Sequence, residues 1–403
     1  MIPKRVASGR LRAVVALSVA LVATACGGGN SPSSTNSGPA QVYKVGLVVP
    51  VTGGGSANAD PVIQGANLAL DEINSKHLAG TNVKLQFVQV DDATDPKTAQ
   101  QVCTQLVTQD QVVAIVGSEN TPSRAACESA IQSQNLPYFA GNGTGGNVCY
   151  SNMFFFGIAP NQQVSPLVDY LTQKQNLKKF YILASDYAPP KGSVAVAAKQ
   201  VPADGGTIVA TTYEPLNTSQ FSSDVAKIAA AQPDLVLSGL VGNDQIPFHK
   251  QLGDDPRTKS IKVASFQMNE AIAAAVGSES VGVFVASDYI SGDSSAANNA
   301  WLAAFNKKYG SSAKPSFFAA ETYDATLMMA AAIKKAGGTD AGKVISAVTQ
   351  VSVDTERGHI VIKDGSHGYA TLAAHIGRVN SNFGIDQIDV TPPVDPVVAC
   401  PSS

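Results

Sequence analysis

Short apolar runs alternate with amphipathic stretches along most of the chain, beginning at residue 42. Residues 42–49 form a nearly continuous apolar run, which is typical of a parallel strand covered on both faces. The next segment has helical spacing and predicts a helix whose buried stripe is formed by Ile63, Ala66, Leu70 and Ile73. Strand-like runs at residues 83–90, 112–116 and 136–140 follow, with helical spacing between them. This order predicts a parallel sheet in a doubly wound α/β fold.

The same pattern begins again after residues 154–158. Helical segments and strand-like runs alternate in the order 166–173, 180–184, 192–200, 207–212, 224–231, 235–240, 247–252 and 261–265. A second α/β unit of this kind predicts two lobes. The chain continues through a strand at 281–286, a helix that carries Trp301, helices at 320–336 and 342–348, and strand-like segments at 358–362 and 371–379 around the turn signal Asp364-Gly365.

Two neighbouring strands of the first unit run directly into polar loops. Residues 118–121 follow one strand, and the glycine-rich residues 141–146 follow the next. Carboxyl ends of neighbouring parallel strands meet at one crevice, where open α/β sheets hold ligands. Pro122 suits the first helical position, so Thr121 is the expected N-cap, and hydroxyl and N–H groups there can receive a carboxylate. The sequence predicts a small-molecule site, with a purely structural turn and a capping role as the alternatives.

The first 25 residues have the features of an export signal. A basic start precedes an apolar run at residues 13–23, which is too short to span a membrane. Small residues then lead directly to Cys26, which resembles the bacterial lipobox and predicts lipidation at this cysteine. An ordinary cleaved signal peptide is the alternative. Residues 26–40 are the expected flexible tether, and the mature protein is expected on the outer face of the cytoplasmic membrane, held by its lipid.

Composition narrows the class of partner. The chain is 44% apolar and 15% charged over 403 residues, enough for two domains with cores of their own. Removing the leader takes away four basic residues and changes the net charge from −3 to −7. No basic patch stands out in the sequence, so nucleic acid is not an expected partner.

Four cysteines follow Cys26, namely Cys103, Cys127, Cys149 and Cys400. An even number outside the cytosol favours disulfides. Cys103 and Cys127 fall on helices predicted on one face of the sheet, so we favour this pair and leave Cys149 for Cys400. A pair between Cys127 and Cys149 is the close alternative.

The sequence motifs give little support for a metal site, a bound cofactor or an enzyme active site. The cysteines lack the C-x-x-C spacing of zinc sites. His359, His367 and His375 recur at intervals of eight across a predicted hairpin, where that spacing does not bring side chains together. Residues 141–146 match G-x-G-x-x-G, but no helix begins there, so a dinucleotide is not expected. Neither a G-x-S-x-G elbow nor a placed Ser, His and carboxylate set is found, and we expect a binder rather than an enzyme.

Several short motifs, taken in their order and spacing, give the chain a family resemblance. They are residues 45–53, Gly65-Ala66, Ile73-Asn74, residues 91–96, Val116-Gly117, Phe221-Ser222 and residues 234–239. With them the chain resembles the Leu/Ile/Val type of periplasmic binding proteins, the type I solute receptors of ABC importers.

The resemblance implies two doubly wound, Rossmann-like lobes joined by a three-crossing hinge that closes on a ligand. Crossings are expected near Pro160, Tyr289 and Ser352. The implied N-terminal lobe comprises residues 41–160 and 290–352, the C-terminal lobe residues 161–289 and 353–390, and residues 391–403 form a tail.

The resemblance also implies site residues. The family's ligand-binding positions correspond to Thr121, Asn142, Gly143, Thr144, Tyr187 and Asn243. Three positions depart from the family: Gln267 replaces an acidic residue that pairs with an ammonium, Asn58 replaces an aromatic residue, and Asn120 replaces a disulfide cysteine. Because a buried ammonium without a counter-charge is costly, we expect a carboxylate- or amide-bearing solute rather than a free α-amino acid.

The implied function is capture of a small polar solute and its delivery to the permease and ATPase subunits of an importer. A receptor subunit that senses the solute without transport is the main alternative. An enzyme on the same fold is a weaker one.

Overall fold

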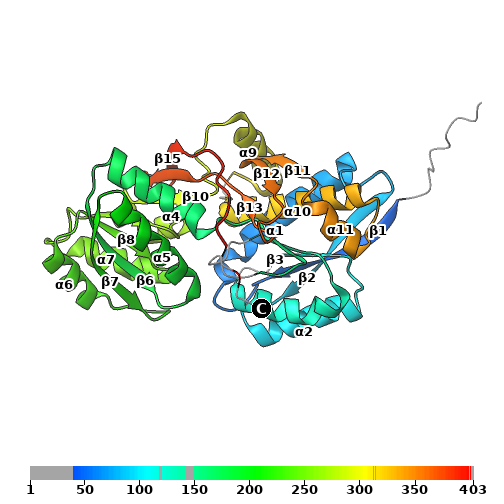
Figure 1. Cartoon of the computed structure of the whole chain (residues 1–403), viewed down its shortest axis with the longest axis horizontal. Coiled ribbons are helices and arrows are strands. Elements are labelled where there is room, and N and C mark those ends of the chain that lie inside the picture. Colours follow the sequence, from blue (N-terminus) through cyan, green and yellow to red (C-terminus); the bar gives the residue numbers. More distant parts are fainter. Residues whose placement is uncertain are drawn as a thin grey trace, which may run out of the picture. The chain divides into compact units, whose positions relative to one another are not determined.

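The structure is a computed structural model that describes residues 40–117, 120–141, 149–311, 313, 315–398 and 400 (Figure 1). The predicted signal segment, most of the tether and Cys26 lie outside these residues. In the described part of the chain, no helix combines the length and the apolar character that a membrane crossing requires.

The first lobe contains a five-stranded sheet in which every paired strand is parallel, as predicted. Its order is β2-β1-β3-β4-β5. The strands are β1 (Gln41–Val49), β2 (Val83–Asp91), β3 (Ile115–Gly117), β4 (Tyr138–Ala140) and β5 (Met153–Phe155).

Helices cover both faces of this sheet (Figure 1). They are α1 (Ala59–Lys76), α2 (Pro96–Thr108), α3 (Thr121–Ile131), α9 (Ala296–Tyr309), α10 (Phe317–Ala336) and α11 (Ala341–Val348). Successive strand residues point to opposite faces. Leu47 therefore packs into the core shared with α1 and α10, whereas Val48 packs with residues of α2 and α3. This double coverage explains the continuous apolar run at the start of the chain.

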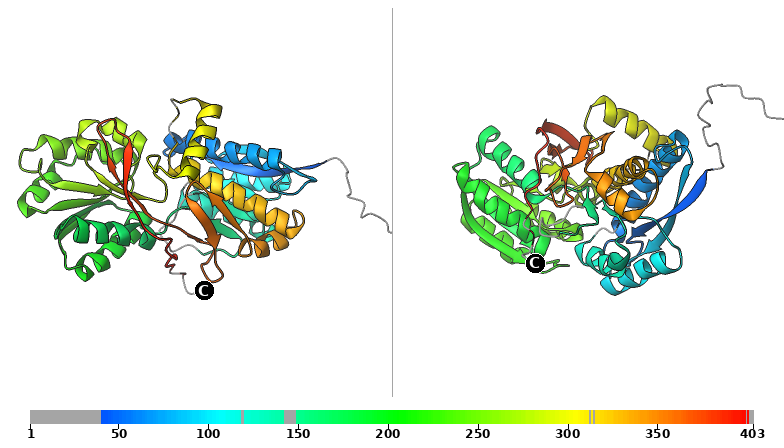
Figure 2. Two further views of the ribbon diagram at one scale, coloured as in Figure 1. Left: turned by 90° about the horizontal axis from the view of Figure 1, so that it is seen from above. Right: turned by 45° about the vertical axis from the view of Figure 1, so that its right-hand side comes forward.

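The second lobe contains a seven-stranded sheet with the order β15-β14-β10-β9-β8-β6-β7. Strands β6 to β10 pair in parallel, and β14 and β15 close one edge in antiparallel pairs (Figure 2). The strands are β6 (Lys179–Ser185), β7 (Thr207–Glu214), β8 (Leu235–Gly239), β9 (Lys262–Ser265), β10 (Phe284–Ser287), β14 (His375–Val379) and β15 (Ile385–Val390).

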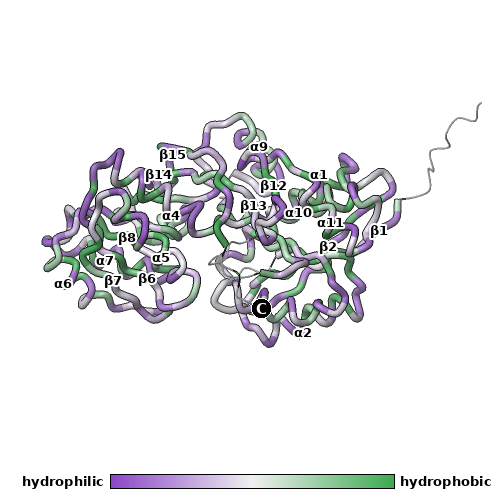
Figure 3. The backbone as a smooth tube through the Cα atoms, viewed as in Figure 1, coloured by the Kyte–Doolittle hydropathy of each residue, from purple (hydrophilic) through white to green (hydrophobic). Residues whose placement is uncertain are grey.

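Five helices flank this second sheet and bury its two faces in separate cores. They are α4 (Pro160–Asp169), α5 (Ala188–Ala203), α6 (Ser222–Ala231), α7 (Gln245–Asp254) and α8 (Glu270–Val276). Ile182 of β6 packs with α4 and α5, and its neighbour Leu183 packs with α6 and α7. Hydrophobic and hydrophilic residues accordingly alternate along the chain in both lobes (Figure 3).

The last part of the chain differs from its predicted division. A small antiparallel sheet consists of β11 (Ser352–Thr355), β12 (Gly358–Ile362) and β13 (Ala370–Thr371). Ile362 and Leu372 pack in the first-lobe core, so the chain returns to the second lobe after residue 372 rather than near Ser352. The single strand expected at 371–379 is therefore two strands in two different sheets. A pattern of apolar residues does not show this change of partner.

Two disulfides are present. Cys103 of α2 is bonded to Cys127 of α3, and Cys149 is bonded to Cys400 near the end of the chain. The segment that leads to Cys400 is also held by hydrogen bonds, because Gln162 donates to the carbonyl of Val394 at 2.7 Å. The tail thus returns from the second-lobe sheet to the first lobe.

Candidate functional site

A cavity lies where four parallel strands of the second lobe end. Strands β6, β8, β9 and β10 have their carboxyl ends at the same edge of the sheet, and a cavity residue lies at the end of each strand or within two residues beyond it. The first lobe contributes the start of α10, and the first chain crossing contributes two more residues. The lining residues are Ile158, Pro160, Gln163, Tyr187, Pro189, Pro190, Ser193, Gly239, Val241, Phe266, Gln267, Met268, Ser287, Asp288, Phe317 and Glu321.

Just over half of the cavity wall is apolar, and a few polar groups are fixed in it. Phe266 and Met268 follow β9, and Phe317 is the first residue of α10. Gln163 of α4 donates to the carbonyl groups of Phe266 and Ala286 at 2.8 and 2.7 Å, which ties the helix to two strand ends. An apolar wall with a small number of placed polar groups is the usual composition of small-molecule sites.

Two carboxyl groups belong to this wall. Asp288 follows β10 and is 1% exposed, and Glu321 of α10 is 2% exposed. Arg357 holds Asp288 in place, because its Nη1 donates to Asp288 Oδ2 at 2.6 Å while its Nε donates to Asp324 Oδ2 at 2.7 Å. One guanidinium therefore joins a second-lobe strand end to the helix that carries Glu321.

Glu321 has a different environment from Asp288. Burial raises the pKa of Glu321 well above its usual range, and the negative charge of Asp288 adds to the rise. Its Oε2 has no hydrogen-bond partner among the described residues. Both causes favour the protonated form of Glu321, and its Oε2 has hydrogen-bonding capacity left over.

Two of the predicted site residues meet in this cavity. Tyr187 follows β6 and precedes α5, and Gln267 follows β9. The backbone of Gln267 is fixed on both sides, because its N–H donates to Ser265 Oγ and its carbonyl accepts from Gln245, each at 3.2 Å. Both residues come from the second lobe.

Asn120 and Thr121 lie at the start of α3 and are not among the lining residues. The N-cap of this helix is Asn120 rather than Thr121, because Asn120 Oδ1 accepts from the Ser123 N–H at 2.8 Å. Thr121 belongs to the first turn, and its hydroxyl accepts from Arg124 Nη2 at 3.1 Å. Pro122 is tolerated in the first turn as well as at its first position, so it does not identify the cap.

The other predicted positions are placed elsewhere or not described. Asn58 ends the short 3-10 turn η1 (Ser56–Asn58), and Asn243 lies in η4 (Gly242–Asp244); neither lines the cavity. Asn142, Gly143 and Thr144 lie outside the described residues.

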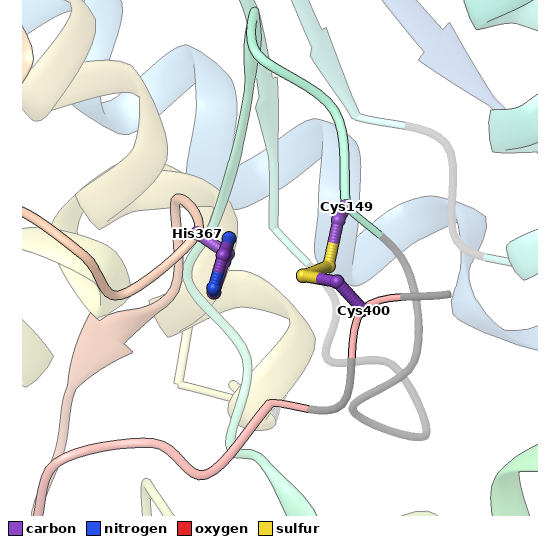
Figure 4. A group of neighbouring side chains, drawn as sticks. All are labelled: Cys149, His367 and Cys400. Atoms are coloured by element: carbon purple, nitrogen blue, oxygen red, sulfur yellow. A yellow bond between two sulfur atoms is a disulfide. The ribbon is translucent and has the colours of Figure 1, made fainter. Parts of the chain in front are cut away.

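The three histidines considered for a metal each have different neighbours. His359 is 2.6 Å from an oxygen of Asp354, and His375 is 2.6 Å from an oxygen of Gln387. His367 lies beside the disulfide of Cys149 and Cys400, with the three candidate ligand atoms within 4.8 Å of one another (Figure 4). Because the two sulfur atoms are bonded to each other, neither is the thiolate that a metal requires.

Comparison with known proteins decides the family. The family model described as periplasmic binding protein matches residues 42–383. The chain belongs to the periplasmic binding protein family. Proteins of this family bind solutes and are not enzymes, and they act outside the cytoplasm.

Three similar proteins illustrate what this binding protein is related to. A Leu/Ile/Val-binding protein homolog of Brucella melitensis is 23% identical over 340 residues, which is 80% of this chain and 86% of the relative. A solute-binding protein of Rhodopseudomonas palustris BisB5, solved with 3,4-dihydroxybenzoic acid, has a TM-score of 0.77 at 25% identity and covers 88% of this chain and 99% of its own. A leucine-binding protein of Thermotoga maritima has a TM-score of 0.74 at 18% identity and covers 87% and 99%.

Sequence reasoning missed the two carboxyl groups of this binding protein. Asp288 follows a predicted strand by two residues, so the rule applied to the first-lobe loops would have found it. Glu321 is the second residue of the helix predicted at 320–336 and the single acidic residue among residues 317–323. A lone acid in such a run indicates a buried carboxyl group that needs a partner.

Proposed function

We propose that this chain is an extracytoplasmic solute-binding lipoprotein that captures a small polar solute between its two lobes and delivers it to an ABC importer. The observation that carries the proposal is the cavity itself, which receives four strand ends from one lobe and the start of α10 from the other. A solute in that position contacts both lobes, so its binding favours the arrangement in which they close on it.

Solute capture is tested first, with the mature protein without its lipid. A thermal-shift screen of amines, amino acids, amides and aromatic acids is followed by calorimetry of each hit. A solute at 100 times its dissociation constant adds about 2.7 kcal/mol to the free energy of unfolding, which such a screen detects. If no solute in a wide screen raises the melting temperature, the proposal fails.

A matched pair of variants tests whether the solute binds in this cavity. Val241→Trp fills the cavity beside the end of β8, whereas Val281→Trp adds the same side chain at an exposed position outside the cavity. We expect the first variant to lose solute binding and the second to retain it. Equal binding by the two variants would place the solute elsewhere.

Anchoring and delivery need separate experiments in cells. Cys26→Ser should release the protein from the membrane fraction and remove the mass of the lipid. Deletion of the gene should abolish uptake of the labelled solute, and the protein without its lipid, added back to spheroplasts, should restore part of it. Unchanged uptake with a lost transcriptional response to the solute would favour the receptor without transport.

A further inference from the structure

The polar chemistry of the cavity is acidic. Among the lining residues in the described part of the chain, Asp288 and Glu321 are carboxylic acids and none is Lys, Arg or His. An anionic solute would therefore meet no ionised donor on this wall. A cationic group would meet two carboxyl groups supplied by two lobes.

The two carboxyl groups are unequally satisfied. Asp288 Oδ2 is paired with Arg357, and Asp288 Oδ1 lies 3.4 Å from the Ser287 hydroxyl. Glu321 Oε2, in a side chain that is 98% buried, lacks a hydrogen-bond partner among the described residues. A buried polar atom without a partner is unfavourable, and a hydrogen-bond donor on a ligand would satisfy it.

Charges behind the cavity wall do not reverse its acidic character. The groups that act on Glu321 are Asp288, Arg357 and Arg124. Arg357 is shared with Asp324 and lies close to the buried Glu356, while Arg124 donates to Thr121 in the first lobe. The two guanidinium groups are thus engaged behind the wall, and neither of them lines the cavity.

We propose that the solute carries a protonated amine on an apolar body, with the amine bound between Glu321 and Asp288 and the body against Phe266 and Phe317. This inference rests on the proposed function and names the class of its solute. It differs from the expectation drawn from Gln267, which assumed that no carboxyl group faces the ligand. Asp288 and Glu321 supply that charge from other elements.

Amine binding is coupled to a proton. In the free protein, burial and Asp288 raise the pKa of Glu321 and so favour its neutral form. When the ammonium arrives, the O–H bond of Glu321 breaks, its proton goes to solvent, and the resulting carboxylate accepts an N–H of the ammonium. A protein molecule in which Glu321 is protonated therefore releases that proton when the amine binds, so the affinity for the amine increases as pH rises until Glu321 is ionised without ligand.

Three probes that share one ring test the charge preference: benzylamine, benzamide and benzoate. Calorimetry at pH 7 in two buffers of different ionisation enthalpy gives the affinity and the proton count for each. We expect benzylamine to bind at least about tenfold more tightly than benzoate and to release protons on binding, and benzamide to release none. This measurement uses the unmodified chain and so does not depend on how a variant folds.

Substitution identifies the group that releases the proton. Glu321→Gln should weaken benzylamine binding by about tenfold or more, abolish the proton release and leave benzamide binding within about threefold. Glu128→Gln is the matched control, because Glu128 is also a buried acid with a raised pKa but lies outside the cavity. It should leave all three affinities and the proton count unchanged.

The outcomes separate this inference from the proposed function. Tighter binding of benzoate than of benzylamine, or benzylamine binding without proton release, overturns the amine assignment while solute capture stands. So does a wide screen that finds only solutes without an amine. If neither the probes nor any solute in that screen binds, the proposed function fails as well.

Discussion

The two lobes have the same construction but contribute to the cavity in different ways. In the second lobe, residues that follow β6, β8, β9 and β10 reach the cavity directly from the sheet edge. Among the described residues of the first lobe, the contribution comes instead from α10, through Phe317 and Glu321. Asn120 and Thr121, which follow β3, make local contacts at the start of α3.

The two parts of the cavity wall are therefore positioned by different interactions, one by the pairing of strands and the other by the packing of a helix. Strand ends are placed by backbone pairing, which follows from the order of strands in the chain. Helix α10 is placed by tertiary contacts, above all close packing against α1 and the bond from Arg357 to Asp324. Substitutions at the contacts that hold α10 therefore test whether tertiary packing positions the first-lobe part of the cavity.

The largest loss of stability is expected at Arg357, which joins Asp288 after β10 to Asp324 of α10. Arg357→Ala leaves Asp288 and Asp324 buried without their cation, and removal of one partner from a buried pair costs about 3–5 kcal/mol. Urea unfolding measures this loss. Arg257→Ala is the control, because its pair with Asp255 is exposed and worth about 1 kcal/mol or less. Similar losses in the two variants would show that Arg357 does not hold the lobes' contributions together.

The contrast between the lobes also sets how far the sequence could predict the site. Alternating runs predicted the parallel sheets. Tyr187 and Gln267, which the family resemblance implied, line the cavity, whereas Thr121, which the rule for strand ends indicated, does not. Glu321 could not be placed, because its position depends on which face of α10 meets the cavity. The strand expected at 371–379 was divided for a similar reason: Leu372 and Ile376 are both apolar, but they pack in the cores of different lobes.

The next largest loss of stability is expected from removal of a disulfide. The first lobe contains the Cys103–Cys127 disulfide, whereas the described residues of the second-lobe sheet and its helices contain none. Cys103→Ser with Cys127→Ser removes a bond that closes a separation of 24 residues, at a cost of about 3 kcal/mol. Hydrogen exchange should show lost protection in α2 and α3 while α5 and α6 are unchanged. The pair Cys149→Ser and Cys400→Ser should instead expose residues 391–400. Loss of protection spread evenly over both lobes would contradict a local role.

A smaller effect is expected where α10 packs on α1. A Cβ at Gly65 would lie 2.0 Å from the carbonyl oxygen of Ala319, so Gly65→Ala forces the two backbones apart. Overpacking of this kind costs about 1–3 kcal/mol. Because α10 carries Glu321, solute affinity should fall along with the melting temperature. Gly54→Ala is the control, since its added Cβ meets nothing within 4 Å; equal stability of the two variants would contradict the close approach.

The smallest effect on stability is expected at Glu128, a buried acid of the first lobe that lies outside the cavity. Burial raises the pKa of Glu128 from 4.5 to about 7, and the hydrogen bond from Asn152 at 3.0 Å only partly opposes the rise. Between these two pH values the folded protein binds more protons at Glu128 than the unfolded chain does, so this group makes stability fall as pH rises.

Glu128→Gln keeps an oxygen that can accept from Asn152 but removes the charge. We expect the variant to gain on the order of 1 kcal/mol over the original chain at pH 8 and to match it near pH 4. Urea unfolding from pH 4 to pH 8 measures the difference between the two curves. Glu321 titrates in both proteins and cancels from that difference, so parallel curves would mean that Glu128 is not the buried acid responsible.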